Sequence, residues 1–334
     1  MFGNHTSPTD ETANSGKGPS RRGVLAAAAA GVLTVGVAVK SSALEGPKPP
    51  GTKAKEETSP FTGLPAEPGP VMVVKIDNHK DARPHTGLEI ADIVVVEQVE
   101  GGLGRLIGVF ASKMPETLGP VRSAREYNVE QLRMFDAPVL AYSGAKESVV
   151  ELIDKSPIFG LSNDNFPSAF RREESRPAPH NLYVDPQKIL AEAPEASVSK
   201  DIGLAFGDRP EGGKATEQFS VKYPAFEASF EWSAEEERWL ASFDGEPAMN
   251  TDGKQLGGTT VVVQKVDMPH NTPDDPTPYI KTVGKGEATV LRNGEAFTTT
   301  WERKSETDGT TYTLENGEKM PFDPGQTWLV YEER

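Results

Sequence analysis

Five tight-turn dipeptides interrupt the second half of the sequence, and they constrain its fold more than any other feature. They are Asp244-Gly245, Asp252-Gly253, Asn293-Gly294, Asp308-Gly309 and Asn316-Gly317. Such pairs favour two-residue hairpin loops, because both loop positions need positive φ. Between them lie strand-like runs such as the alternating Phe226, Ala228, Phe230 and Trp232. Residues 219–334 are therefore predicted to form a mostly-β domain.

The preceding segment, residues 71–195, mixes strand and helix signals. Compact apolar runs predict strands over Val71–Ile76, Ile90–Val99, Leu106–Ala111 and Pro138–Tyr142. Apolar residues at helical spacing predict helices over Tyr127–Phe135 and Lys146–Asp154, and Asp185-Pro186 is typical of a third helix start. The expected fold class is α+β. A mixed-sheet domain with helices packs against the mostly-β domain in a layered β/β/α arrangement, and residues 196–218 form the linker.

The first 43 residues read as a twin-arginine signal segment. Ser20-Arg21-Arg22-Gly23 precedes a mildly apolar stretch from Val24 to Val39, and small residues end it at Ala43. The stretch has 16 residues, which is short for a spanning helix of about 20. Residues 44–70 are rich in proline and charge and predict a solvated tether. We therefore expect an extracytoplasmic protein, either released or held by an uncleaved N-terminal segment.

Charge and cysteine content exclude several classes of protein. The net charge is −15, and residues 44–334 alone carry −17. Such a surface repels nucleic acid and anionic lipid, so neither is an expected partner. The chain has no cysteine, which rules out disulfides, thiolate metal sites and a lipid anchor on an N-terminal cysteine. Nothing in the sequence calls for a cofactor.

Several motifs resemble the YerB-like family of exported bacterial proteins. They run through Val73–His79, Ala82-Arg83-Pro84, Gly119–Arg125, Ala141–Gly144, Ala178–Tyr183 and Gly325–Trp328. The resemblance covers about Pro60 to Tyr331 and implies a two-part α+β protein at the cell envelope, with a domain of unknown function in each part. Members are commonly lipoproteins, and the missing cysteine departs from that pattern. The family supplies no mechanism, so the site is argued from the residues.

The run Gly119–Glu126 is the sharpest candidate site. Ser123 and Glu126 have capping-box spacing before an apolar helical run. Backbone N–H groups at a helix start attract anions, and Arg122 and Arg125 add guanidinium groups suited to phosphate or carboxylate. Two further arginines, Arg83 and Arg105, are candidates for the same site. The alternative is a helix cap whose arginines form structural salt bridges.

Other polar residues follow predicted strands. Ser143 lies at a strand-to-helix junction and could form a second wall of the same pocket; as a nucleophile it lacks a recognisable base. His180 and Asn181 either contribute to the site or anchor a loop. Asp77, His79 and His180 could bind zinc, but their spacing matches no metal motif, so no metal site is assigned.

Two carboxylates suggest an enzymatic alternative. Glu100 lies beside Gly101-Gly102, and Asp77 follows a buried strand. As an acid and a base they could cleave a glycan. In the competing interpretation, Glu100 pairs with Arg105 or Arg122 as a strand-end salt bridge.

Three functions remain open from the sequence. The first is a binding module for an anionic envelope ligand, such as a peptidoglycan or phosphate-bearing glycan fragment. The second is a glycan hydrolase or lyase that uses Glu100 and Asp77. The third is a scaffold for envelope protein complexes, with no small ligand.

Overall fold

The computed structural model describes residues 57–270 and 276–334. The predicted signal segment and the first part of the predicted tether lie outside these ranges. No helix among the described residues is long and apolar enough to cross a membrane.

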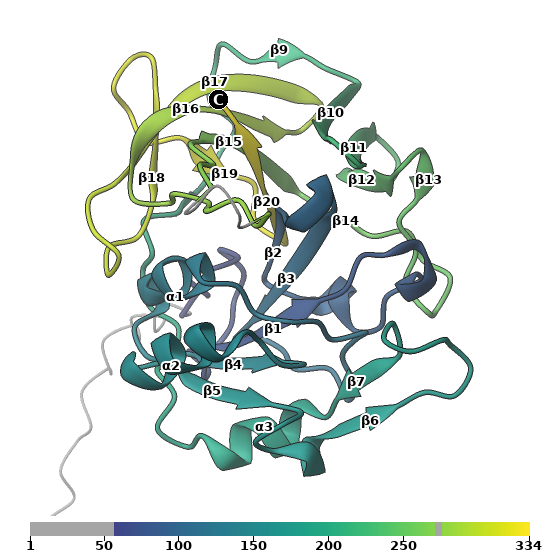
Figure 1. Cartoon of the computed structure of the whole chain (residues 1–334). Coiled ribbons are helices and arrows are strands. Elements are labelled where there is room, and N and C mark those ends of the chain that lie inside the picture. The colour runs from purple at the N-terminus through teal and green to yellow at the C-terminus, as the bar shows by residue number, and fades with distance from the viewer. Residues whose placement is uncertain (1–56, 271–275) are drawn as a thin grey trace, which may run out of the picture. The chain divides into compact units, whose positions relative to one another are not determined.

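An eleven-stranded sheet, the main sheet, takes strands from both halves of the sequence (Figure 1). Its order is β18 (Thr311–Leu314), β17 (Glu295–Arg303), β16 (Gly284–Arg292), β15 (Thr260–Val266), β20 (Thr327–Glu333), β2 (Ile93–Gln98), β3 (Gly104–Phe110), β1 (Met72–Ile76), β4 (Val139–Tyr142) and β5 (Phe159–Ser162), with β9 (Lys214–Ala215) paired to β17. Strand β20 pairs in parallel with β15 on one side and with β2 on the other. Residues 71–195 and 219–334 are thus joined by the hydrogen bonds of one sheet.

The other strands form separate, smaller sheets, and the described ranges also contain short helices. A five-stranded sheet contains β10 (Gln218–Tyr223), β11 (Phe226–Ser233), β12 (Arg238–Phe243), β13 (Glu246–Pro247) and β14 (Gly257–Gly258). Two small pairs are β6 (Phe170–Arg172) with β7 (Leu182–Val184), and β8 (Ala205–Phe206) with β19 (Pro321–Phe322). The α-helices of the described ranges are α1 (Tyr127–Leu132), α2 (Glu147–Lys155) and α3 (Pro186–Glu192). The fold is therefore mostly β with few helices, which confirms the predicted class in its coarse form.

Alternation along the central strands produces two hydrophobic cores. In β1, Val74 belongs to a core that includes Phe230 of the five-stranded sheet. Its neighbour Val73 belongs to a second core, with Leu132 of α1 and Ile153 of α2. Successive side chains of a strand point to opposite faces, so an apolar run such as Val71–Ile76 is buried on both sides. Each such side chain stabilises the fold by about 1.5–3 kcal/mol.

Local sequence signals placed several elements correctly. The predicted hairpin turns are confirmed at Asp244-Gly245 and Asn293-Gly294, where all four residues have positive φ. The predicted start of the third helix is also confirmed, since the Asp185 side chain accepts hydrogen bonds from the N–H groups of residues 187 and 188.

The folded part begins earlier than the predicted Val71. Phe61 is fully buried, with its ring centroid 5.4 Å from that of Phe135. Residues 57–70 are therefore not solvated tether, because an aromatic side chain within the proline-rich segment packs into the second core. Residues 196–218, predicted as linker, contain β8 and β9 and reach the start of β10.

Candidate functional site

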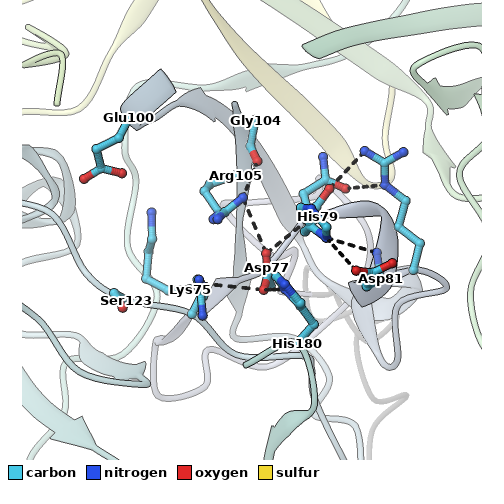
Figure 2. Close-up of polar contacts among 12 residues, drawn as sticks. Lys75, Asp77, His79, Asp81, Glu100, Gly104, Arg105, Ser123 and His180 are labelled. Carbon is cyan, nitrogen blue, oxygen red and sulfur yellow. Dashed lines mark hydrogen bonds and ion pairs between the residues drawn. The ribbon is translucent and has the colours of Figure 1, made fainter. Parts of the chain in front are cut away.

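Charged side chains gather at one end of the main sheet, where β1 and β2 end and β3 begins (Figure 2). Asp77 directly follows β1, Glu100 lies just beyond β2, and Arg105 is the second residue of β3. The antiparallel pairing of β3 with both neighbours brings these three positions to the same end.

Asp77 is the centre of a buried cluster, which we call the Asp77 cluster. Its side chain is fully buried. One carboxylate oxygen, Oδ1, accepts a hydrogen bond from the backbone N–H of His79 (3.1 Å) and lies 3.4 Å from an Arg105 guanidinium nitrogen. The other, Oδ2, lies 2.8 Å from Nδ1 of His180 and 3.7 Å from Nε of Arg122. Two arginines and one histidine are therefore held by a single carboxylate.

The surroundings of Asp77 favour its ionised form. Burial by itself would raise the pKa of this carboxyl, but the Arg105 charge and the His180 hydrogen bond together hold it below its ordinary value. Asp77 is thus an anion at neutral pH.

Arg105 brings a buried, unpaired hydrogen-bond donor to the cluster. Only 6% of its surface is exposed, and its buried Nε has no hydrogen-bond partner among the described residues. Most buried polar groups in proteins are paired, so an unpaired one calls for an explanation. Since Arg105 and Arg122 share one carboxylate, these two side chains carry one positive charge more than Asp77 balances.

A second buried pair, Lys75 with Glu97, was missed from the sequence. Both side chains are fully buried and form an ion pair, and Asn128 donates a hydrogen bond to Glu97 (3.3 Å). Burial and the nearby Arg125 and Arg105 charges lower the pKa of Lys75 well below its ordinary value. The pair is electrically neutral wherever its proton lies, so it leaves the positive excess unchanged. The one sign of this buried pair in the sequence was a single lysine within the apolar run Val71–Ile76.

A cavity of about 370 Å³ has Glu100 in its wall, at the same end of the main sheet as the Asp77 cluster. It is lined by Glu100, Ser123–Tyr127, Ser143–Lys146, Ser148, Val149 and Thr277–Tyr279. Ser123 follows Arg122 in the chain, and Arg105 interacts electrostatically with both Asp77 and Glu100. Figure 2 shows Arg105 between these two carboxylates. Most of the predicted site residues thus lie near this end of the main sheet, divided between the cavity and the Asp77 cluster.

Glu100 and Arg125 form a two-pronged ion pair in the cavity wall. Both Arg125–Glu100 hydrogen bonds measure 2.6 Å, and the Thr277 hydroxyl donates a third to Glu100 (2.8 Å). Partial burial opposes ionisation, but these contacts lower the pKa of Glu100 to about 2. The salt-bridge interpretation of Glu100 is therefore correct in kind, with Arg125 as the partner in place of Arg105 or Arg122.

The predicted capping box at Ser123 is wrong. Helix α1 starts at Tyr127, and the backbone N–H of Arg125 is bonded by the Asn128 side chain (2.8 Å). Ser123 lies too early in the chain to cap, and its hydroxyl is 3.3 Å from that of Ser143. Both serines line the cavity, as predicted for two walls of one pocket. The described residues give Ser143 no hydrogen bond to a basic side chain, so its geometry does not favour a nucleophile.

Two predicted site residues lie outside the site. Arg83 bonds Asp244 (2.8 Å) and stacks over the ring of Phe243, which ties the loop after β1 to the five-stranded sheet. Asn181 donates to the carbonyls of Glu173 and Arg176. Asn181 is thus a loop anchor, which was the alternative interpretation, and Arg83 is a structural link.

The carboxylates do not have the protonation that glycan cleavage requires. A general acid must hold its proton near neutral pH, which needs a raised pKa. The pKa values of Glu100 and Asp77 are both lowered, and Asp77 is fully buried. The arrangement is therefore better suited to holding an anion than to acid–base catalysis.

The histidines lie on the opposite side of Asp77 from the cavity wall (Figure 2). The rings of His79 and His180 stack with centroids 4.3 Å apart. Potential ligand atoms of His79, Asp81 and His180 all lie within 4.8 Å of one another. Asp77, the third residue of the predicted zinc set, forms ion pairs with Arg105 and Arg122. The third potential ligand of the triad is therefore Asp81.

Family models and known proteins match almost the whole described part of the chain. The model of the N-terminal domain of a protein of unknown function, DUF3048, matches residues 61–199, and that of the DUF3048 C-terminal domain matches residues 219–329. A Bacillus subtilis protein named "Putative lipoprotein YerB" is 30% identical over 296 residues, which cover 83% of this chain and 86% of that protein. The crystal structure of YerB from Bacillus subtilis has a TM-score of 0.72 at 24% identity, and the match covers 82% of this chain and 96% of that one.

Proposed function

This chain belongs to the YerB-like family with DUF3048 domains, and we propose that it is an exported envelope protein that binds an anionic ligand at the end of its main sheet. The ligand carries a carboxylate or phosphate group, as peptidoglycan and phosphate-bearing glycan fragments do. One observation carries the proposal: Arg105 and Arg122 share the single carboxylate of Asp77, and the buried Nε of Arg105 has no partner among the described residues.

The charge arrangement gives an anion a reason to bind here. Arg125 is neutralised by Glu100, and Lys75 by Glu97. Arg105 and Arg122 together carry one positive charge more than Asp77 supplies in negative charge. A buried cation without full compensation is costly, and an incoming anion relieves that cost.

The adjoining cavity supplies volume and hydrogen-bond donors. Its size of about 370 Å³ lies within the range of small-ligand pockets. The hydroxyls of Ser123 and Ser143, and Tyr279 beyond them, give its wall groups that can bond an uncharged sugar or peptide portion. These groups favour a pose in which the anionic group of the ligand lies beside the arginines and its polar remainder lies in the cavity.

The overall negative charge of the protein favours anion binding at the arginines over binding elsewhere on the surface. Residues 44–334 carry −17, so most of the surface repels an anionic ligand. Binding therefore depends on the arginines at the end of the main sheet, and it should weaken with salt if these side chains make the contact.

Export is supported by the sequence and by the named relative. The twin-arginine pattern lies in residues 1–43, and the Bacillus subtilis relative carries a lipoprotein name. We propose that this chain works on the same side of the membrane without the lipid, because it has no cysteine to carry one.

The test is binding of the purified chain to purified peptidoglycan and to phosphate-bearing wall polymer, measured by sedimentation. The variant Arg122→Ala should lose about tenfold or more in affinity, since hydrogen bonds to charged groups contribute about 1.5–3 kcal/mol each. A matched control, Arg171→Ala, removes a surface arginine whose side chain is half exposed. Equal binding by Arg122→Ala, the control and the unchanged chain would end the proposal.

A further inference from the structure

Three potential metal ligands meet beside the Asp77 cluster, on the side away from the cavity. His79 and Asp81 belong to the turn after β1, and His180 comes from the loop before β7. All three ligand atoms lie within 4.8 Å of one another. Segments about a hundred residues apart are thus brought together by the fold.

Before any side chain moves, two of the ligand atoms are close to the spacing found around one ion. Nδ1 of His79 and Oδ2 of Asp81 are 3.4 Å apart. Tetrahedral bonds of about 2.0–2.1 Å place neighbouring ligand atoms about 3.3 Å apart. Nδ1 of His79 accepts a hydrogen bond from the Asp81 backbone N–H (3.3 Å), so this nitrogen is unprotonated, and a bound ion would take the place of that hydrogen bond.

Asp77 supplies the support that a metal-binding histidine usually has. Its carboxylate accepts the hydrogen bond from Nδ1 of His180 (2.8 Å). Ligating histidines commonly donate their second ring N–H to a carboxylate in this way, which leaves the other nitrogen, Nε2, for the ion. Asp77 is itself fixed by Arg105 and Arg122, so it orients His180 without competing for the ion.

The site is accessible and adjustable. Side-chain exposure is 32% for His79, 45% for Asp81 and 14% for His180. The imidazole rings stack only 13° from parallel. Binding an ion in the plane of both rings therefore requires the His79 ring to turn, and its exposure permits that rotation.

We propose that His79, Asp81 and His180 bind a divalent transition ion of the zinc class, with Asp77 as the outer carboxylate. Two imidazoles and one carboxylate suit Zn²⁺, Co²⁺ or Fe²⁺ better than Mg²⁺ or Ca²⁺, which prefer oxygen ligands. Three protein ligands leave a fourth position open to water or to a ligand group, as in catalytic sites. The three ligand side chains differ from the arginines and the cavity residues of the proposed anion binding, although both regions contact Asp77.

Calorimetric titration of the chelator-treated protein with Zn²⁺ tests the proposal, with Co²⁺ absorption as a second readout. We expect one ion per chain, no comparable binding of Mg²⁺, and a visible Co²⁺ spectrum typical of nitrogen and oxygen ligands. His180→Ala and Asp81→Asn should each weaken binding about tenfold or more. The matched controls, His270→Ala and Asp252→Asn, alter exposed residues that are not members of the triad and should leave the affinity unchanged.

Two results would overturn the inference. One is an absence of stoichiometric Zn²⁺ binding by the unchanged protein. The other is a titration that is the same for His180→Ala, Asp81→Asn and the controls, which would assign the ion to other surface groups. Because the readout is the metal titration itself, it is independent of peptidoglycan binding, and either proposal can fail alone.

Discussion

Oδ2 of Asp77 lies 2.8 Å from Nδ1 of His180, although 103 residues separate the two in the chain. This contact joins the end of β1 to the loop before β7. The same carboxylate also contacts Arg105 through Oδ1 and Arg122 through Oδ2, so the two arginines and the stacked histidines meet at one anion. Asp77 is therefore a structural anion that organises both candidate binding regions.

Replacing this anion should strongly destabilise the fold. Asp77→Asn removes the charge that compensates Arg105 and Arg122, and breaking a buried pair typically costs about 3–5 kcal/mol. Urea unfolding followed by tryptophan fluorescence measures the change. Asp244→Asn, which removes the charge from the more exposed Arg83–Asp244 pair, should cost less than about 1 kcal/mol. Similar stability of the two variants would show that Asp77 is not a buried charge centre.

Glu100 should stabilise the protein only above the acidic range. Its folded pKa of about 2 lies below the ordinary value of 4.5, so its contribution is present above about pH 4.5 and is lost as the pH falls toward 2. The difference in unfolding free energy between the unchanged chain and Glu100→Gln should therefore be largest near pH 6 and shrink below pH 4.5. Glu151→Gln, on the exposed face of α2, is the control, and the prediction fails if the Glu100→Gln difference is the same at pH 6 and pH 3.

His85 should make stability depend on pH in a higher window. Burial lowers its pKa to about 4, and its Nε2–H donates to the Asp77 carbonyl (2.8 Å). The unfolded chain binds a proton at this residue below about pH 6.5, so stability is full above that value and is lost as the pH falls toward 4. The shift corresponds to about 3 kcal/mol. His85→Gln should flatten the stability curve between pH 6.5 and 4, and an unchanged slope would contradict the buried neutral state.

The chain should release no soluble fragments from peptidoglycan. Glu100 and Asp77 are both ionised at neutral pH, so neither can donate the proton that the leaving group needs. Mass spectrometry of the supernatant after incubation with purified peptidoglycan checks this. Release that disappears in Glu100→Gln would restore the enzymatic interpretation.

Phe61 should stabilise the fold although it lies in the proline-rich segment. Its ring is fully buried against Phe135, and Phe→Ala in a core costs about 3–5 kcal/mol. Thermal unfolding of Phe61→Ala measures the loss. Leu64→Ala, at a position that is 46% exposed, is the nearby control. Equal melting temperatures for the two variants would support the original prediction that residues 57–70 are a solvated tether.

Local signals in the sequence determined much of the strand layout. Asp244-Gly245 and Asn293-Gly294 specify their hairpins because Asp, Asn and Gly tolerate the positive φ that these turns require. The run Val71–Ile76 specified a buried strand, and Asp185 specified a helix start. The family resemblance was also carried by short motifs.

Only the tertiary structure decided which distant segments meet. No local pattern places β20 between β15 and β2, because its parallel partners are far away in the chain and are selected by packing. The same holds for the bond of Glu100 to Arg125 and for the position of Asp81 beside His180. The sequence showed which charged residues could take part in binding or catalysis. The pairing of strands decided which of those charges neutralise one another, and it left Arg105 and Arg122 sharing a single carboxylate.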